Sequence, residues 1–304
     1  MAPDKKYKGV IVPMICPLRE DKTIDRTGTE RIINSFLEAG VSPFVLGTTG
    51  EASSIPSKQK EILVKETVKH VRGKTITYAG ISSDCLANSV ETGKKFADIG
   101  VDVLVTTLPS YYPLKESNML RYCEELADAC PLPLILYNIP GTTGFSVPLD
   151  VIEKLSHHPN IAGLKDSERD QARLEKSIDR WKDRADFSHL TGWAAMSAFA
   201  LRQGSDGIVP STGNFAPAVY RNLYQAVLKG ETDKAEKMQA KTDKLSSLYQ
   251  KGRNLSESLA ALKIIMSVKG LCGTQMLPPI YRMDKKAETE YKKHVQAELE
   301  KIDY

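Results

Sequence analysis

The chain has 304 residues, a mass of 33.6 kDa, and 42 basic against 38 acidic residues, which give a formal net charge of +4 at pH 7. This length suffices for a continuous core, so the sequence is not that of a small domain that depends on disulfides. The charges are scattered, which argues against nucleic-acid binding. No segment approaches the roughly 18 apolar residues of a membrane span, and the first residues contain no apolar signal segment. We therefore expect neither a nucleic-acid nor a membrane partner, and a cytoplasmic location.

The metal-binding residue types are sparse. The five cysteines are odd in number, widely spaced and without a C-x-x-C pair, and the five histidines form no cluster with ligand spacing. They predict neither a disulfide framework nor a zinc site, and we expect no metal.

Short apolar runs alternate with longer amphipathic segments up to about residue 230. The runs predict eight strands, at 9–18, 41–47, 75–80, 102–108, 133–138, 161–166, 187–192 and 207–212. The segments between and after them predict helices at 26–39, 57–71, 88–99, 117–129, 148–156, 171–183, 194–202 and 217–228. Because parallel strands need crossover connections, this alternation predicts an α/β protein with a (β/α)8 TIM barrel, a fold of typically about 250 residues.

A doubly wound open sheet is the alternative. It would place a glycine-rich turn after the first strand, and residues 17–20 contain no glycine. The rest of the chain predicts helices at 231–250, 255–268 and 287–302, the last two separated by Pro278-Pro279. We therefore expect a barrel with the active site in residues 1–230 and a C-terminal helical extension in residues 231–304.

Catalytic side chains of such barrels lie at the carboxyl ends of the strands. Lys165 ends the apolar sixth strand, where poor solvation would lower the pKa of its amine. A neutral amine can attack a ketone and form a Schiff base. The alternative is a solvated lysine paired with Asp166 at the barrel rim.

Tyr137 ends the fifth strand and so is expected beside Lys165. Its phenol could transfer protons to the intermediate or to the substrate hydroxyl. Alone it would be read as a packing aromatic, but a lysine and a tyrosine at adjacent strand ends favour catalysis. The turn Gly47-Thr48-Thr49-Gly50-Glu51, here called the 47–51 turn, offers backbone N–H groups and two hydroxyls to a small carboxylate, or is an ordinary turn.

These residues belong to five motifs in a fixed order: GTTGE at 47–51, PSYYP at 109–113, YNIP at 137–140, GLKDS at 163–167 and DGIV at 206–209. In them the chain resembles the pyruvate-dependent class I aldolase and lyase family, which includes dihydrodipicolinate synthase, N-acetylneuraminate lyase and the 2-keto-3-deoxy sugar-acid aldolases. The resemblance extends over nearly the whole chain.

The resemblance implies a role for each motif. Lys165 would form the Schiff base with pyruvate and Tyr137 would be the acid and base. Thr48 and Thr49 would hold the pyruvate carboxylate, with Thr48 also relaying protons. Tyr111 would reach into the site of a neighbouring subunit, which implies a homotetramer made of two dimers. The family needs no cofactor beyond the lysine Schiff base.

Five further residues are candidates for substrate binding. They are Gly47, Val209, Ser211, Thr142 and Gly192. By resemblance the Val209 carbonyl faces the reacting centre, whereas the others lie in turns at strand ends.

Departures from the motifs suggest the substrate. Dihydrodipicolinate synthases resemble one another in an arginine, two residues after the proline of the Tyr-Asn-x-Pro motif, that binds the carboxylate of the second substrate. This chain has Thr142 at that position. Neuraminate lyases carry an acidic pair where this chain has Ala194-Ala195. The pattern is most similar to the 2-keto-3-deoxy sugar-acid aldolases.

We therefore expect a carbon–carbon lyase that reversibly cleaves a 2-keto-3-deoxy sugar acid, or an N-acetylneuraminate-like acid, to pyruvate and an aldehyde. The alternatives are a 4-hydroxy-tetrahydrodipicolinate synthase, a dehydratase or deaminase of the same family, and a carboxylate-binding protein without turnover.

Overall fold

The computed structural model describes residues 3–302. In these residues eight strands follow one another in sequence order around a closed barrel, which confirms the predicted TIM-barrel fold. The strands are β1 (Gly9–Pro13), β2 (Ser42–Val45), β3 (Tyr78–Gly80), β4 (Val103–Thr106), β5 (Leu134–Asn138), β6 (Ile161–Asp166), β7 (Ser188–Thr191) and β8 (Gly207–Ile208).

The helices that connect the strands are α1 (Arg26–Ala39), α2 (Ser57–Val71), α3 (Leu86–Ile99), α4 (Glu116–Ala129), α5 (Pro140–Thr143), α6 (Leu149–Leu155), α7 (Gln171–Trp181) and α8 (Ser197–Gln203). After β8 come α9 (Pro217–Leu228), α10 (Thr232–Gln250), α11 (Leu255–Val268) and α12 (Lys285–Lys301), and three short 3-10 helices lie at η1 (Ala52–Ser54), η2 (Ala194–Met196) and η3 (Ser211–Asn214). None of the helices in the described residues has both the length and the apolar character needed to cross a bilayer.

Local sequence explains several helix ends. Gly40 caps the carboxyl end of α1, and its φ of 68° is left-handed and suits glycine. Asp170 caps α7 by accepting a hydrogen bond from the Arg173 N–H. Asn254 and Glu257 form a capping box at the start of α11. These signals are readable in the sequence, and α1, α2, α9 and α11 have the predicted bounds.

Several predicted strands are too long. The first was expected at 9–18, but β1 ends at Pro13, and the last was expected at 207–212, but β8 ends at Ile208. Pro13 and Pro210 lack the N–H group that a strand ladder needs. The Asn214 side chain binds the polypeptide beyond both strands, accepting a hydrogen bond from the Ile15 N–H at 2.8 Å and donating one to the Ser211 carbonyl at 2.8 Å. The helix expected at 194–202 divides into η2 and α8.

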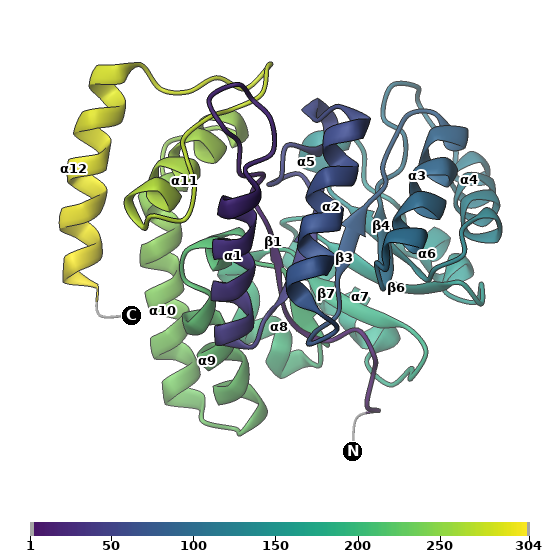
Figure 1. Ribbon diagram of the computed structural model, residues 1–304. Coiled ribbons are helices and arrows are strands. Elements are labelled where there is room, and N and C mark those ends of the chain that lie inside the picture. Colours follow the sequence, from purple (N-terminus) through teal and green to yellow (C-terminus); the bar gives the residue numbers. More distant parts are fainter. Residues whose placement is uncertain (1–2, 303–304) are drawn as a thin grey trace. The chain divides into compact units, whose positions relative to one another are not determined.

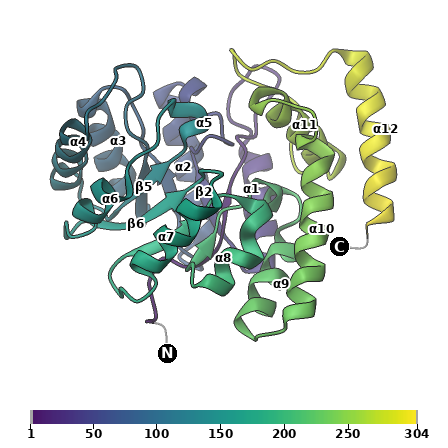
Figure 2. The same cartoon turned by 180° about the vertical axis from the view of Figure 1, so that it is seen from behind.

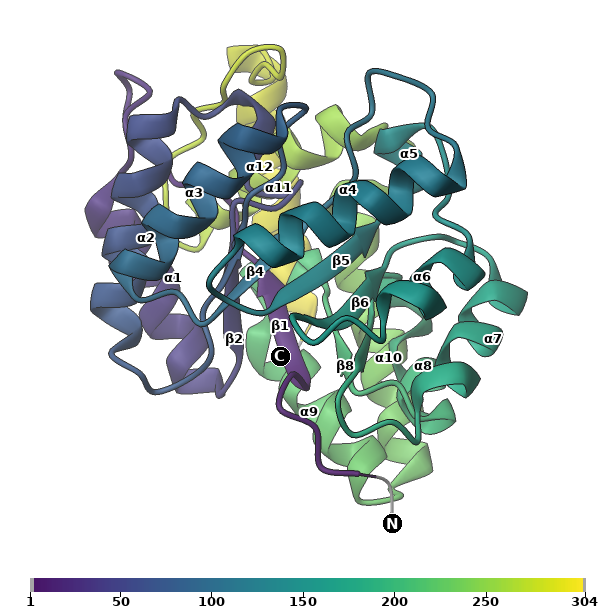
Figure 3. The ribbon, with the colours of Figure 1, turned by 90° about the vertical axis from the view of Figure 1, so that its right-hand side faces the viewer.

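The chain forms two compact units. The first contains residues 3–11 and 76–210, so it includes β3 to β8 and their helices. Its strands β4, β5 and β6 run side by side, with α4 and α6 over them (Figure 3). In this pairing Tyr137 stands in register with Lys165, and Asn138 with Asp166.

The second unit contains residues 12–75 and 211–302. Here α10 packs along α9, α11 packs on α10, and α12 on α11 (Figures 1 and 2). Helix α11 is buried on every side from Ser258 to Met266. The division into a barrel of residues 1–230 and an extension of residues 231–304 stays a prediction.

Candidate active site

The amine of Lys165 lies over the ring of Tyr137. Both residues stand next to last in paired strands, and the distance from the Lys165 Nζ to the centroid of the Tyr137 ring is 3.6 Å. Lys165 is only 4% exposed and Tyr137 8% exposed. The structure therefore brings together the two residues that the strand-end argument paired.

Burial changes the chemistry of this amine. It lowers the pKa of Lys165 because the charged ammonium loses its hydration, while the charge and hydrogen bonding of Tyr137 act in the opposite direction. A lower pKa leaves more of the amine neutral near pH 7, and only the neutral form is a nucleophile. Burial therefore favours the neutral form of this amine, and a phenol lies beside it.

Behind this pair, one residue further along each strand, lies a buried polar network. The Asn138 Nδ2 donates to the Asp166 Oδ1 at 2.8 Å and to the Glu168 Oε2 at 2.9 Å. The Arg173 Nε donates to the Asp166 Oδ2 at 2.8 Å, and Ser146 donates to Glu168. Because successive side chains of a strand point to opposite faces, this network lies on the other side of the sheet from Lys165. The burial of Lys165 thus favours the reactive amine over the solvated lysine paired with Asp166.

Gly192 and Val209 lie in the same unit. The Gly192 N–H donates to the Asp166 carbonyl at 2.6 Å, and a Cβ at position 192 would stand 2.0 Å from the Ser167 Oγ. Only glycine allows β7 to approach the end of β6 this closely. Val209 is buried, and its N–H donates to the Thr191 carbonyl at 2.8 Å.

Two other predicted residues of this unit are exposed. Thr142 lies on the single-turn helix α5, where its hydroxyl donates to the Ile139 carbonyl at 3.2 Å. Tyr111 is 77% exposed and stacks edge-on against Tyr112, with ring centroids 5.0 Å apart. The described chain therefore presents two adjacent aromatic rings to solvent at the 109–113 motif.

The 47–51 turn follows β2 in the second unit. Leu46, just before the turn, and Glu51, its last residue, have unusual left-handed φ values of 58° and 55°. A Cβ at Gly50 would lie 2.9 Å from the Met14 carbonyl oxygen, so this position requires glycine. Gly47 is buried, whereas Thr48 and Thr49, in the middle of the turn, are half-buried. Such a strained, tightly packed turn is typical of a site that holds a ligand in one orientation.

Ser211 belongs to η3 in this second unit. Its hydroxyl shares a hydrogen bond of 2.7 Å with the phenol of Tyr249, which also lies 3.0 Å from the Thr212 hydroxyl. Tyr249 is buried in α10, and burial raises the pKa of its phenol. A residue of the C-terminal helices therefore fixes a predicted substrate-binding serine.

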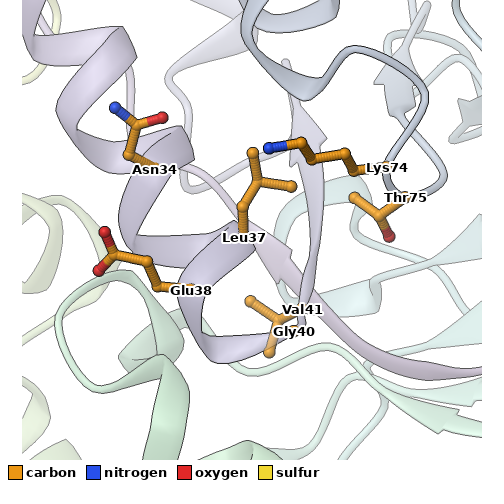
Figure 4. Close-up of a pocket in the computed structure, with 7 residues that line it drawn as sticks. All are labelled: Asn34, Leu37, Glu38, Gly40, Val41, Lys74 and Thr75. Atoms are coloured by element: carbon orange, nitrogen blue, oxygen red, sulfur yellow. The ribbon is translucent and has the colours of Figure 1, made fainter.

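A surface pocket of about 410 Å³ also lies in the second unit, lined by residues of α1, by Gly40 and Val41 before β2, and by Lys74 and Thr75 after α2 (Figure 4). Leu37, Val41 and Lys74 are among its lining side chains. It adjoins the amino end of β2, whereas the 47–51 turn follows the carboxyl end. Since barrel enzymes react at the carboxyl ends, this pocket is not the candidate active site.

The contacts around these residues were not predicted from the sequence, although Asn138 and Asp166 lie in the motifs given above. Asn138, Asp166 and Arg173 form the network behind Lys165, and Lys263 forms a buried ion pair with Glu51. A lysine within the apolar run of 259–266 was the available signal for Lys263. Among residues 3–302 no three His, Cys, Asp or Glu side chains lie close enough to hold a metal ion, and the expectation of no cofactor stays a prediction.

Known proteins resemble the chain over almost its full length. YagE of Escherichia coli, which has the provisional name of a 2-dehydro-3-deoxy-D-gluconate aldolase, is 28% identical over 293 residues, 94% of this chain and 95% of YagE. The 4-hydroxy-tetrahydrodipicolinate synthase of Methanosarcina mazei is 30% identical over 233 residues, 76% of this chain and 79% of that protein.

Solved structures agree with this result. Dihydrodipicolinate synthase from Bacteroides thetaiotaomicron superposes with a TM-score of 0.91 at 29% identity, covering 97% of this chain and 99% of that one. The structure of YagE in complex with pyruvate gives a TM-score of 0.89 at 27% identity, covering 96% and 98%. The sequence pattern of the dihydrodipicolinate synthetase family matches residues 6–298. The chain therefore belongs to the dihydrodipicolinate synthetase family of pyruvate-dependent lyases, as its motifs predicted.

Proposed function

We propose that this lyase forms a Schiff base between Lys165 and a 2-oxo acid, and that it reversibly cleaves a 2-keto-3-deoxy sugar acid to pyruvate and an aldehyde. The observation that carries the proposal is the buried Lys165 amine, 3.6 Å from the centroid of the Tyr137 ring on the neighbouring strand. The YagE complex with pyruvate supports a 2-oxo acid as the ligand.

In the proposed reaction, the neutral Lys165 amine attacks the substrate ketone and forms a carbinolamine. Tyr137 transfers the protons needed for loss of water, which gives the iminium ion. Tyr137 then removes the proton from the 4-hydroxyl, the bond between C3 and C4 breaks, and its electrons move into the iminium to form an enamine. The aldehyde leaves, the enamine is protonated at C3, and water releases pyruvate and restores the amine. Every electron pair is returned, so the cycle needs no external oxidant or reductant.

The 47–51 turn takes the carboxylate in this proposal. Thr48 and Thr49 supply hydroxyl and backbone N–H donors, and Thr48 relays protons. Charge-assisted hydrogen bonds from such donors orient an anion strongly. Gly47, Gly192, Val209, Ser211 and Thr142 are proposed to shape the substrate site.

The sugar-acid substrate is favoured by Thr142. A short hydroxyl there cannot provide the bidentate grip on a second carboxylate that a guanidinium would supply. The likeness to YagE supports the same substrate class. The relative from Methanosarcina mazei supports the second candidate, synthesis from pyruvate and aspartate semialdehyde.

One assay separates the candidates. The purified protein is incubated with 2-keto-3-deoxy sugar acids, with N-acetylneuraminate, and with pyruvate plus aspartate semialdehyde, while pyruvate release or consumption is followed. We expect pyruvate release from a keto-deoxy sugar acid. Consumption of pyruvate only with aspartate semialdehyde would establish the synthase instead. Turnover of a 2-oxo acid without pyruvate release would indicate a dehydratase or deaminase, and binding without turnover a carboxylate-binding protein.

The oligomeric state and location stay predictions. We propose a homotetramer of two dimers in the cytoplasm, in which the exposed Tyr111 enters a neighbouring subunit's site. Light scattering on the purified protein tests the tetramer, and a monomer would contradict it.

A further inference from the structure

Glu51, the last residue of the 47–51 turn, forms an ion pair with Lys263 of α11. The Lys263 Nζ lies 2.5 Å from the Glu51 Oε1, and their side chains are 1% and 0% exposed. The other carboxylate oxygen accepts a hydrogen bond from the Leu277 N–H at 2.8 Å, and Lys263 also donates to the Gln275 carbonyl at 2.5 Å. The turn is thereby tied both to α11 and to the 275–277 segment that follows it.

The same carboxylate lies at the strained end of the turn. Glu51 has a φ of 55°, a conformation that a residue with a side chain adopts only when its surroundings impose it. The Glu51 N–H donates to the Thr48 carbonyl at 3.1 Å. The backbone at Glu51 is therefore coupled directly to the conformation of Thr48.

Stability alone does not require an ion pair at this place. Two charges without access to water lose much hydration, and well-packed apolar residues of similar volume often stabilise a protein equally well. What an ion pair adds, when each partner is also hydrogen-bonded to backbone as here, is a fixed position for both side chains. Glu51 meets the ammonium of Lys263 and the N–H of Leu277 on separate oxygens, which restricts both its position and its rotation.

We propose that Lys263 and Glu51 are positioning residues for the subsite that binds the carboxylate of the 2-oxo acid. Lys263 holds Glu51, and Glu51 holds the 47–51 turn in the shape in which Thr48 and Thr49 meet the substrate carboxylate. Helix α11 thus takes part in substrate binding without contacting substrate. This inference rests on the proposed function.

The chain offers a matched control in its first unit. Lys5 is equally buried, donates to the Asp206 Oδ2 at 2.8 Å, and donates to a backbone carbonyl, that of Trp181, at 2.7 Å. Lys5 and Lys263 therefore have the same set of partners, one carboxylate and one carbonyl. Only Lys263 is joined to the 47–51 turn.

The experiment measures covalent trapping of pyruvate by borohydride at different pyruvate concentrations in Lys263→Met, Glu51→Gln, the double variant and Lys5→Met, together with thermal unfolding of each protein. We expect Lys263→Met and Glu51→Gln to raise the half-saturating pyruvate concentration about tenfold or more, with the saturating rate changed by less than about threefold. The Lys5→Met variant should lose stability but keep the wild-type half-saturation.

The double variant removes both charges and leaves a side-chain amide oxygen at position 51 to accept the Leu277 N–H. Its unfolding temperature should recover toward that of the wild type. Its half-saturating pyruvate concentration should stay raised, because no ion pair fixes the position of the side chain at residue 51. The inference would be overturned if the half-saturating pyruvate concentration of the double variant returned to the wild-type value together with its stability. It would also be overturned if that concentration rose as much in Lys5→Met as in Lys263→Met. If Lys263→Met does not fold, the half-saturating pyruvate concentration of Glu51→Gln decides in the same way.

Two outcomes separate the inference from the proposed function. A wild-type protein that traps no pyruvate would overturn the proposed function and the inference with it. Normal trapping by the wild type, with an unchanged half-saturating pyruvate concentration in the variants, would overturn the inference alone.

Discussion

Two buried lysines of this protein have different surroundings. Lys263 meets a carboxylate at 2.5 Å and a backbone carbonyl at 2.5 Å. Lys165 lies 3.6 Å from the centre of a phenol ring, and burial lowers its pKa. A carboxylate stabilises the ammonium form of its partner, whereas lost hydration favours the neutral amine. The two lysines are thus alike in burial and differ in the groups that face them, and we propose only Lys165 as a nucleophile.

Substituting each lysine in turn tests most strongly whether the two differ in function. The substitution Lys165→Met deletes the proposed nucleophile and should reduce pyruvate release by about 10⁴-fold or more, since loss of a covalent catalyst removes most of the rate enhancement. Steady-state assay with a keto-deoxy sugar acid measures it. If Lys263→Met reduced the rate of pyruvate release at saturating substrate by the same factor, the proposed distinction between a nucleophile at Lys165 and a positioning residue at Lys263 would be contradicted.

The next test removes the phenol beside Lys165. We expect Tyr137→Phe to lower the saturating rate by roughly 10²- to 10⁴-fold, the usual contribution of general acid–base catalysis. The variant retains the ring, so the packing around the amine is largely kept.

The same variant should also move the pH profile. Tyr137 raises the pKa of Lys165 against the effect of burial, so its hydroxyl's removal should lower that pKa further. Imine formation falls as the amine becomes protonated, and the acidic limb of the borohydride-trapping profile should therefore shift to lower pH. A shift to higher pH would contradict the assigned role of the phenol.

A third test concerns stability. Breaking a buried ion pair leaves one charge without its partner, so Lys263→Met and Lys5→Met should each lower the free energy of unfolding by about 3–5 kcal/mol. Denaturant unfolding measures both. A loss below about 1 kcal/mol, the value of a surface pair, would show that water reaches the remaining carboxylate.

The smallest effect is expected at His189, in the first unit. Its ring lies between the hydroxyls of Ser177 and Ser205, each 3.0 Å away, and burial, with smaller contributions from Lys5 and Arg173, lowers its pKa to about 3. Between the ordinary histidine pKa of about 6.5 and that value, the unfolded chain binds a proton that the folded chain does not.

Stability should consequently fall on acidification. This contribution amounts to about 2 kcal/mol between pH 7 and pH 5, at about 1.4 kcal/mol per pH unit below the unfolded pKa. Denaturant unfolding of wild type and His189→Gln at both pH values measures it, and the variant should lack this part of the loss. Equal losses in the two proteins would mean that His189 is protonated in the folded state.

Much of the fold could be predicted from the sequence because its signals are local. Helices α1, α2, α9 and α11 begin and end where predicted, and the apolar periodicity located all eight strands. The extent of β1 and β8 was overestimated, since Pro13 and Pro210 lack the N–H group of a strand ladder and the Ile15 N–H beyond β1 donates to the Asn214 side chain. Such pairing joins residues about 200 positions apart and leaves no local pattern.

The candidate site shows the same limit. Lys165 and Tyr137 could be predicted because strand order alone makes them neighbours. The partnership of Glu51 with Lys263 could not, since 212 positions separate them and nothing in a single sequence shows which helix meets which turn. Polar residues within apolar segments indicate that a partner exists without identifying it.

We propose above all that the buried amine of Lys165 forms an imine with a 2-oxo acid. Borohydride reduction of the wild-type protein with pyruvate, followed by peptide mass spectrometry, tests it most directly. We expect one added 1-carboxyethyl group, the reduced pyruvate adduct, on Lys165, and no adduct in Lys165→Met. An unmodified Lys165, or an adduct on a different lysine such as Lys263, would contradict it.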